Sequence, residues 1–161
     1  MEIVLYVNGK KYKLDVGSEE RLLDVLRDKI GIKSVREGCS EGECGACTVL
    51  MDKKPVTSCL VLAFQAEGKE ILTVEGLIEN GELDQLQKSF IEKGAIQCGY
   101  CTPGMILSIK GLLYQNPNPT EEEIREAIAG NLCRCTGYKK IVDAVIDAVQ
   151  KGEERCVRTR Q

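Results

Sequence analysis

The first half of the chain alternates hydrophobic and polar positions with the period of a β-strand. The dipeptide Asn8-Gly9 lies between two alternating segments and is a strong signal for a tight β-hairpin. Ser18 is a good helix N-cap, and the hydrophobic positions from Leu22 to Leu26 predict a helix after it. The predicted strands cover residues 2–7, 11–16, 48–51, a segment at Val56, and residues 71–74. A hairpin, a crossing helix and further short strands predict an α+β half with a mixed sheet.

After about residue 80 the hydrophobic positions recur with the 3.6-residue period of an α-helix. Thr102-Pro103 predicts one helix start, with the threonine as cap and the proline in the first turn. Thr120 and Glu123 form a capping box for another helix. The predicted helices are a stripe from Leu83 to Ile91, then residues 102–115, 120–128 and 141–149, followed by a polar tail that frays from Lys151. The second half is therefore predicted to be a small all-α bundle of four helices.

The change of period predicts two domains, with a boundary near residue 80. We place the first domain at residues 1–77, the second at 78–152 and a polar tail at 153–161. The chain of 161 residues has two Phe and no Trp, so both cores must be small and aliphatic. Metal clusters that cross-link distant segments would stabilise such cores.

Composition excludes several classes of function. A net charge of −3 without a basic block argues against nucleic acid as a partner. No apolar run approaches the ~20 residues that span a bilayer. The start of the chain lacks the basic region of a signal peptide, so a cytoplasmic protein is expected. Because the chain has no histidine, a Rieske centre, a Cys2His2 zinc finger and a histidine-based triad are all excluded.

Four cysteines of the first half have the spacing C-x4-C-x2-C followed by a distant cysteine. They are Cys39, Cys44, Cys47 and Cys59. This is the pattern of a plant-type [2Fe–2S] ferredoxin, and the glycines around it allow a tight loop. A four-cysteine zinc site is the alternative, but zinc ribbons pair two short C-x-x-C knuckles. Disulfides are the other alternative, and a cytoplasmic protein argues against them.

Four cysteines of the second half form two close pairs. They are Cys98, Cys101, Cys133 and Cys135. The C-x-x-C pair alone fits a thioredoxin-like redox motif or half a zinc site. Each pair precedes a predicted helix, so two positive helix N-termini would face one anionic cluster. Cys156 belongs to neither set and is predicted to be a free thiol.

Both cysteine motifs, with their flanking residues, resemble one family. Residues 37–49, Glu-Gly-Cys-Ser-Glu-Gly-Glu-Cys-Gly-Ala-Cys-Thr-Val, are similar to the first-cluster motif of the iron–sulfur subunit of molybdenum hydroxylases. Residues 97–105 and 130–138 are similar to the second-cluster motifs of the same subunit. This is the family of xanthine dehydrogenase, aldehyde oxidoreductase and carbon monoxide dehydrogenase. The resemblance extends from about residue 3 to 150.

The resemblance implies a fold and a role. The first domain would be a plant-type ferredoxin-like (β-grasp) domain and the second a four-helix [2Fe–2S]-binding domain. The chain would relay electrons from a molybdenum–pterin large subunit, through the helical cluster and then the ferredoxin-like cluster, to an FAD-binding subunit or another acceptor. Cys135 and Gln97 would contact the pterin. The subunit would not catalyse by itself, and its partners would be separate chains of a hetero-oligomer.

Two other functions remain open at this point. One is a freestanding two-cluster ferredoxin, which would diffuse between partners. The other is a zinc-stabilised scaffold without sulfide. The substrate of a hydroxylase complex is not encoded in this chain, and a purine, another N-heterocycle, an aldehyde or carbon monoxide would each fit.

Overall fold

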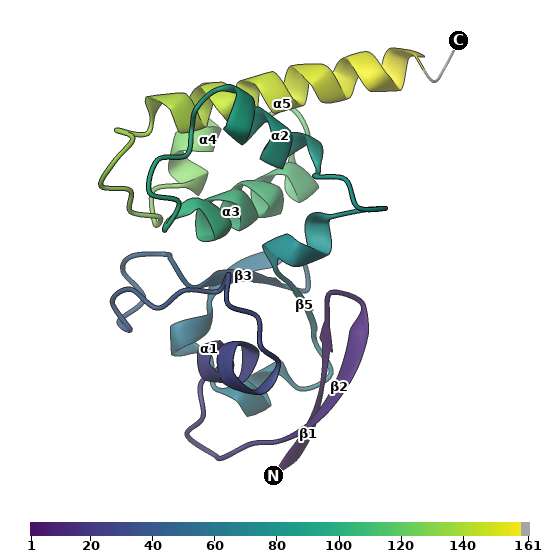
Figure 1. Ribbon diagram of the computed structural model, residues 1–161, viewed down its shortest axis with the longest axis vertical. Helices are drawn as coiled ribbons and strands as arrows, with labels where there is room; N and C mark the ends of the chain where they lie inside the picture. Colours follow the sequence, from purple (N-terminus) through teal and green to yellow (C-terminus); the bar gives the residue numbers. More distant parts are fainter. Residues whose placement is uncertain (159–161) are drawn as a thin grey trace.

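The chain folds into a sheet half and a helical half that are stacked on each other (Figure 1). The computed structural model describes residues 1–158, with side chains as far as Gly152. Five strands form one sheet: β1 Glu2–Val7, β2 Lys10–Asp15, β3 Thr48–Met51, β4 Lys54–Thr57 and β5 Glu70–Leu72. Their order is β2-β1-β5-β3-β4, with β1 and β5 parallel and the other neighbours antiparallel. The predicted mixed sheet is confirmed.

The β1–β2 hairpin turns at the predicted dipeptide. Asn8 and Gly9 both have positive φ, 51° and 76°, which matches the right-handed twist of the two strands. Short 3₁₀ turns, which the sequence pattern did not predict, lie between β4 and β5 at Ser58–Leu60 and Ala63–Ala66, and after β5 at Val74–Leu77.

The helix of the sheet half begins later than predicted. Helix α1 covers Leu22–Asp24 and continues as a π-helical turn over Val25–Lys29. The prediction of Ser18 as N-cap is wrong, because the residues before the helix pair with residues 61–63 instead. The Leu22 amide donates to the Val61 carbonyl at 2.7 Å, and the Ala63 amide donates to the Glu20 carbonyl at 2.8 Å. These two bonds hold Arg21 in an extended conformation directly before the helix.

Four helices form the second half, as predicted. They are α2 Gln85–Glu92, α3 Thr102–Gln115, α4 Glu121–Ala127 and α5 Lys139–Arg158. Asp84 caps α2, and Thr120 with Glu123 forms the predicted capping box of α4. The prediction that Thr102 caps α3 is wrong by one residue, because the Cys101 carbonyl already accepts the first helical bond, from the Met105 amide.

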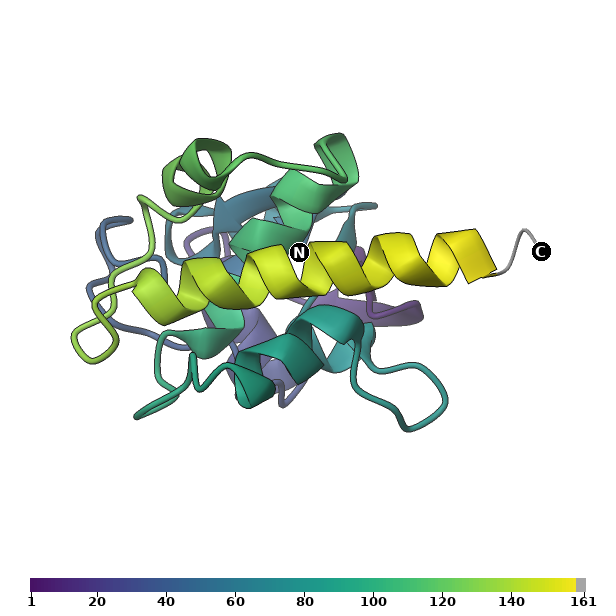
Figure 2. The same cartoon turned by 90° about the horizontal axis from the view of Figure 1, so that it is seen from above.

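Helix α5 extends well past its predicted end at Val149 and lies across the outer side of the bundle (Figure 2). The tail expected to fray from Lys151 is helical as far as Arg158. The Cys156 side chain and residues 159–161 lie outside the part that the structure describes, so the free thiol stays a prediction.

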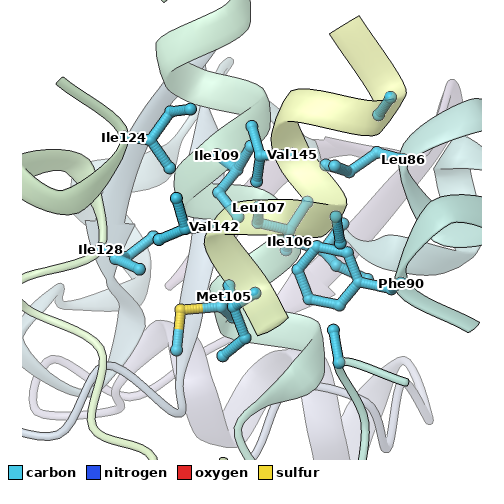
Figure 3. Packing of buried hydrophobic residues seen from close by; sticks show 14 of the residues in the cluster. Leu86, Phe90, Met105, Ile106, Leu107, Ile109, Ile124, Ile128, Val142 and Val145 are labelled. Atoms are coloured by element: carbon cyan, nitrogen blue, oxygen red, sulfur yellow. The ribbon is translucent and has the colours of Figure 1, made fainter. Parts of the chain in front are cut away.

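The helical core is mainly aliphatic, and the Phe90 ring is buried within it (Figure 3). Phe90 of α2, Met105 and Ile109 of α3, and Val142 and Val145 of α5 are all buried. Leu50 of strand β3 belongs to the same cluster, so α3 packs directly on the sheet half. This contact fixes the position of the α3 N-terminus relative to the loop that precedes β3.

A buried side chain links the two halves by hydrogen bonds. Asn131, which is 4% exposed, donates from Nδ2 to the Gly45 carbonyl at 3.1 Å and to Thr48 Oγ1 at 3.4 Å. Its Oδ1 accepts from Ser108 Oγ at 2.7 Å. The Asn131 side chain therefore connects the loop at Gly45, helix α3 at Ser108 and its own loop by hydrogen bonds.

Replacing Asn131 by alanine is expected to lower the free energy of unfolding by about 1–3 kcal/mol, because buried polar groups without a partner cost that much. Urea unfolding under anaerobic conditions measures the change. Asn118→Ala, at an exposed position, is the control and is expected to stay within about 0.5 kcal/mol of the parent. Equal stability of the two variants would contradict the role of Asn131.

Candidate metal centres

The first cysteine quartet lies in the loop before β3 and in the turn after β4. Cys47 and Cys59 are buried, whereas Cys39 and Cys44 are partly exposed. The antiparallel register of β3 and β4 pairs Thr48 with Thr57, which brings the distant Cys59 back to the loop. Both the amide and the hydroxyl of Ser58 donate to the Cys47 carbonyl, at 3.3 Å and 2.7 Å. The structure thus brings together the four residues that the spacing selected.

Two glycines let this loop close around the sulfur atoms. A Cβ at Gly38 would lie 2.7 Å from Cys44 Sγ. Gly42 has a φ of +81°, and a Cβ there would lie 2.4 Å from Leu60 Cδ1. A side chain at Gly38 would displace Cys44 Sγ, and at Gly42 the positive φ disfavours any residue other than glycine.

Backbone amides of the loop point at sulfur. Cys39 Sγ accepts hydrogen bonds from the amides of Glu41, Glu43 and Cys44 at 3.4 Å, 3.3 Å and 3.4 Å. These hydrogen bonds lower the pKa of the Cys39 thiol to about 7, and the largest effect comes from the Glu41 amide, followed by the Cys44 amide. In contrast, burial and the hydrogen bond to Cys47 raise the pKa of Cys59 to about 11. Inward N–H groups of this kind stabilise a thiolate and the extra negative charge of a reduced cluster.

The second quartet lies where two loops meet at the end of the helical bundle. Cys98 and Cys101 precede α3, and Cys133 and Cys135 precede α5. Cys98 and Cys135 are exposed, whereas Cys101 and Cys133 are partly buried. Helix α3 begins directly after Cys101, as expected for a helix N-terminus at the cluster, but residues 136–138 separate Cys135 from α5.

The four thiols of this quartet interact in an outer and an inner pair. In the outer pair the hydrogen bond between the Cys135 and Cys98 thiols raises the pKa of Cys135. The pKa of Cys98 is lowered, mainly by the hydrogen bond from the Tyr100 amide and then by the bond to Cys135. In the inner pair, burial and then the hydrogen bond to Cys133 raise the pKa of Cys101 to about 12. Burial acts to raise the pKa of Cys133, but bonds from Thr136 lower it overall.

The two quartets fit binuclear clusters, which take two thiolates on each iron. The cysteines of each quartet interact with one another. In the first, Cys59 interacts with Cys47 and Cys39, and Cys39 with Cys44; in the second, Cys101 interacts with Cys133 and Cys98, and Cys135 with Cys98 and Cys133. The pairing, the sulfur-directed amides and the glycine-lined loop together form a suitable cradle for such a group.

The two loops touch each other directly. The Leu132 amide donates to the Cys44 carbonyl at 2.9 Å, so one hydrogen bond connects a residue of the first quartet to the neighbour of Cys133. The Arg36 guanidinium donates to the Gly99 carbonyl and lies 5.1 Å from the centre of the Tyr100 ring. The Tyr100 hydroxyl donates to the Glu37 carbonyl.

The outer edge of the second quartet is exposed. Gln97 is exposed and directly precedes Cys98, whose thiol pairs with that of Cys135. Nearby, Tyr138 packs against the helical core and accepts a hydrogen bond from the Cys133 amide at 2.8 Å. Tyr100 is 48% exposed and links the two loops instead.

The sequence reasoning missed two polar side chains of the site. Thr136 Oγ1 donates to Cys133 Sγ at 3.0 Å, and Arg36 links the two loops. The contact of Thr136 could have been predicted, because a hydroxyl three residues after a cysteine can reach its sulfur. Arg36 gave no local signal, because its contact lies 63 residues away.

Comparisons with known proteins define the class. Residues 5–73 match the family described as 2Fe-2S iron-sulfur cluster binding domain, and residues 73–146 match the [2Fe-2S] binding domain family. Each matched segment contains one cysteine quartet. The chain is therefore a protein with two [2Fe–2S]-binding domains, and the zinc and disulfide alternatives are not supported.

Similar proteins identify the family within that class. The nicotinate dehydrogenase small FeS subunit of Eubacterium barkeri is 56% identical over 149 residues, which cover 92% of this chain and 95% of that protein. The xanthine dehydrogenase iron-sulfur-binding subunit of Escherichia coli O157:H7 is 48% identical, covering 88% and 89%. The structure of quinoline 2-oxidoreductase from Pseudomonas putida 86 contains a chain with a TM-score of 0.91 and 46% identity, covering 96% of both chains.

The chain belongs to the family of small iron–sulfur subunits of molybdenum hydroxylases. It is an electron-transfer subunit of an oxidoreductase with several subunits, and the molybdenum–pterin cofactor is held by a partner. The freestanding ferredoxin is therefore the less suitable description. Among the described residues, no helix has the length and hydrophobicity to cross a membrane.

Proposed function

We propose that the two cysteine quartets hold the two [2Fe–2S] clusters of this subunit. Cys39, Cys44, Cys47 and Cys59 would bind the first cluster, and Cys98, Cys101, Cys133 and Cys135 the second. When bound, the clusters supply two one-electron carriers. The chain's own part is to hold them at a fixed separation and to connect them.

The strongest support for electron transfer between the two quartets is the 2.9 Å hydrogen bond from the Leu132 amide to the Cys44 carbonyl. It gives a short path of covalent bonds and one hydrogen bond between a ligand of each quartet. The buried Asn131 next to Leu132 holds the same two loops together. The two quartets thus belong to one connected unit.

The exposed edge of the second quartet supports a direction for electron flow. We propose that electrons enter from the pterin at Cys135 and Gln97, pass to the inner pair, cross to Cys44, and leave from the first cluster. The acceptor is an FAD-binding subunit or another carrier. The domains divide as 1–77 and 78–152, and the complex works in the cytoplasm.

The relatives support a substrate class for the complex. The relatives above and others act, by their names, on nicotinate, nicotine, xanthine and caffeine, and one matched solved structure is a quinoline 2-oxidoreductase. Other matches, at 39–45% identity, are aldehyde oxidoreductases, so the N-heterocyclic relatives are the basis of the proposal that follows. We propose an N-heteroaromatic substrate, oxidised on the molybdenum-bearing partner. Anaerobic substrate addition to the purified complex, followed by EPR, tests this: N-heterocycles and not simple aldehydes should reduce both clusters.

Replacing Gln97 by alanine is expected to slow substrate-driven reduction of the second cluster about tenfold, because one hydrogen bond worth about 1.4 kcal/mol is lost in the donor contact. Iron content should not change, since the side chain is exposed. Rapid-freeze EPR on the complex measures the rate. Gln115→Ala, another exposed glutamine, is the control, and an equal rate in both variants would remove Gln97 from the proposed entry point.

A further inference from the structure

The loop between the second pair of cysteines and α5 is closed by hydrogen bonds of its own. The Cys133 amide donates to the Tyr138 hydroxyl oxygen at 2.8 Å, and the Tyr138 amide donates to Thr136 Oγ1 at 3.2 Å. Gly137 and Tyr138 both have positive φ, 62° and 69°, which turns the chain back toward Cys133. Tyr138 holds this unusual backbone conformation although it is not a glycine.

This closed loop orients the Thr136 hydroxyl. Its oxygen accepts from the Tyr138 amide, so its proton is left to donate, and it points at Cys133 Sγ at 3.0 Å. The Thr136 amide donates to the same sulfur at 3.4 Å. Cys133 is partly buried, so water competes less for this sulfur than for the exposed Cys98 and Cys135.

The two quartets differ in the kind of donor that reaches sulfur. The hydrogen bonds to Cys39 in the first quartet come from backbone amides, which no substitution of a side chain removes. In the second quartet the Thr136 hydroxyl also donates to sulfur, and its acceptor is Cys133 of the inner pair. Cys133 directly follows Leu132, whose amide donates to the Cys44 carbonyl. A hydrogen bond to a ligand sulfur stabilises the reduced, more negative form of a cluster and raises its reduction potential.

We propose that Thr136 is a positioning residue that sets the reduction potential of the second cluster through its hydrogen bond to Cys133. The inference rests on the proposed function, in which Cys133 is a ligand. The hydroxyl makes the second cluster a better electron acceptor for the entering electron, independently of the first cluster.

The test is an EPR-monitored redox titration of the whole complex carrying Thr136→Val, which removes the hydroxyl and keeps the branched shape. The second cluster should shift to a lower midpoint potential, and the first cluster, as internal reference, should not move. Thr136→Ser should restore the parent potential. Thr102→Val is the matched control: it also removes a hydroxyl beside a ligand, Cys101, but among the described contacts that hydroxyl reaches no sulfur.

Three results would overturn the proposal. One is an unchanged second midpoint in Thr136→Val, and another is an equal shift of both clusters, which would indicate a general disturbance. If Thr136→Val fails to hold the cluster, Thr136→Ala is titrated in its place. Failure of both, with Thr136→Ser intact, would assign Thr136 to cluster assembly instead of tuning. Cys133→Ala tests the ligand assignment separately: retention of both EPR signals would overturn that assignment and, with it, the inference that rests on it.

Discussion

Replacing Cys101 by alanine is expected to remove the second cluster and leave the first. Iron and sulfide should fall from about four of each to about two of each per chain, since each [2Fe–2S] cluster contributes two. Substrate-driven electron transfer to the acceptor should fall to background, because the connection from the exposed edge to Cys44 passes through the inner pair. Chemical analysis, EPR after dithionite reduction and turnover of the complex measure the three quantities.

Cys156→Ala is the control for this experiment, because Cys156 belongs to neither quartet. It should retain about four irons per chain and both EPR signals. If Cys101→Ala kept both signals, or if Cys156→Ala lost one, the assignment of the second quartet would be wrong. Loss of both clusters in Cys101→Ala would show that the two halves assemble as one cooperative unit.

Replacing Gly104 by alanine is expected to force the two halves apart. A Cβ at this buried position of α3 would lie 2.3 Å from the Gly45 carbonyl oxygen, and that atom is backbone and has no rotamer to change. Overpacking of this kind costs about 1–3 kcal/mol. The first-cluster loop should also be disturbed, because Gly45 lies between Cys44 and Cys47.

Gly152→Ala is the matched control for the stability measurement. Gly152 lies in α5, and a Cβ there would meet nothing within 4 Å, so alanine should stabilise the helix by about 0.5–1 kcal/mol. The two glycine-to-alanine changes are therefore expected to have opposite signs in thermal or urea unfolding followed by the visible absorption of the clusters. A Gly104 variant as stable as the parent would contradict the tight contact between the halves.

Local signals predicted most of the elements. The Asn8-Gly9 turn and the Thr120 capping box depend on residues close in sequence, and both form as predicted. The helix start at Ser18 failed because a bridge between Arg21 and Leu62 holds the chain extended. The insertion of β5 between β1 and β3 also depends on pairings between distant residues, which no local pattern contains.

The candidate site was predictable where covalent spacing carries the chemistry. The cysteines of each proposed quartet interact with one another, and C-x4-C-x2-C and C-x-x-C fix part of the geometry within each loop. Their assignment as ligands stays a prediction. What joins the quartets was not predictable. The approach of Gly104 to Gly45 and the amide of Asn131 are properties of the packed interface between α3 and the loop before β3.

The most direct test of the central claim is EPR of the anaerobic complex after reduction by its substrate, together with iron and sulfide analysis of the same sample. We expect about four irons and four sulfides per chain, and two distinct [2Fe–2S] signals that both appear on substrate addition. A single signal, or two signals that dithionite produces and substrate does not, would contradict a relay through both quartets of this chain.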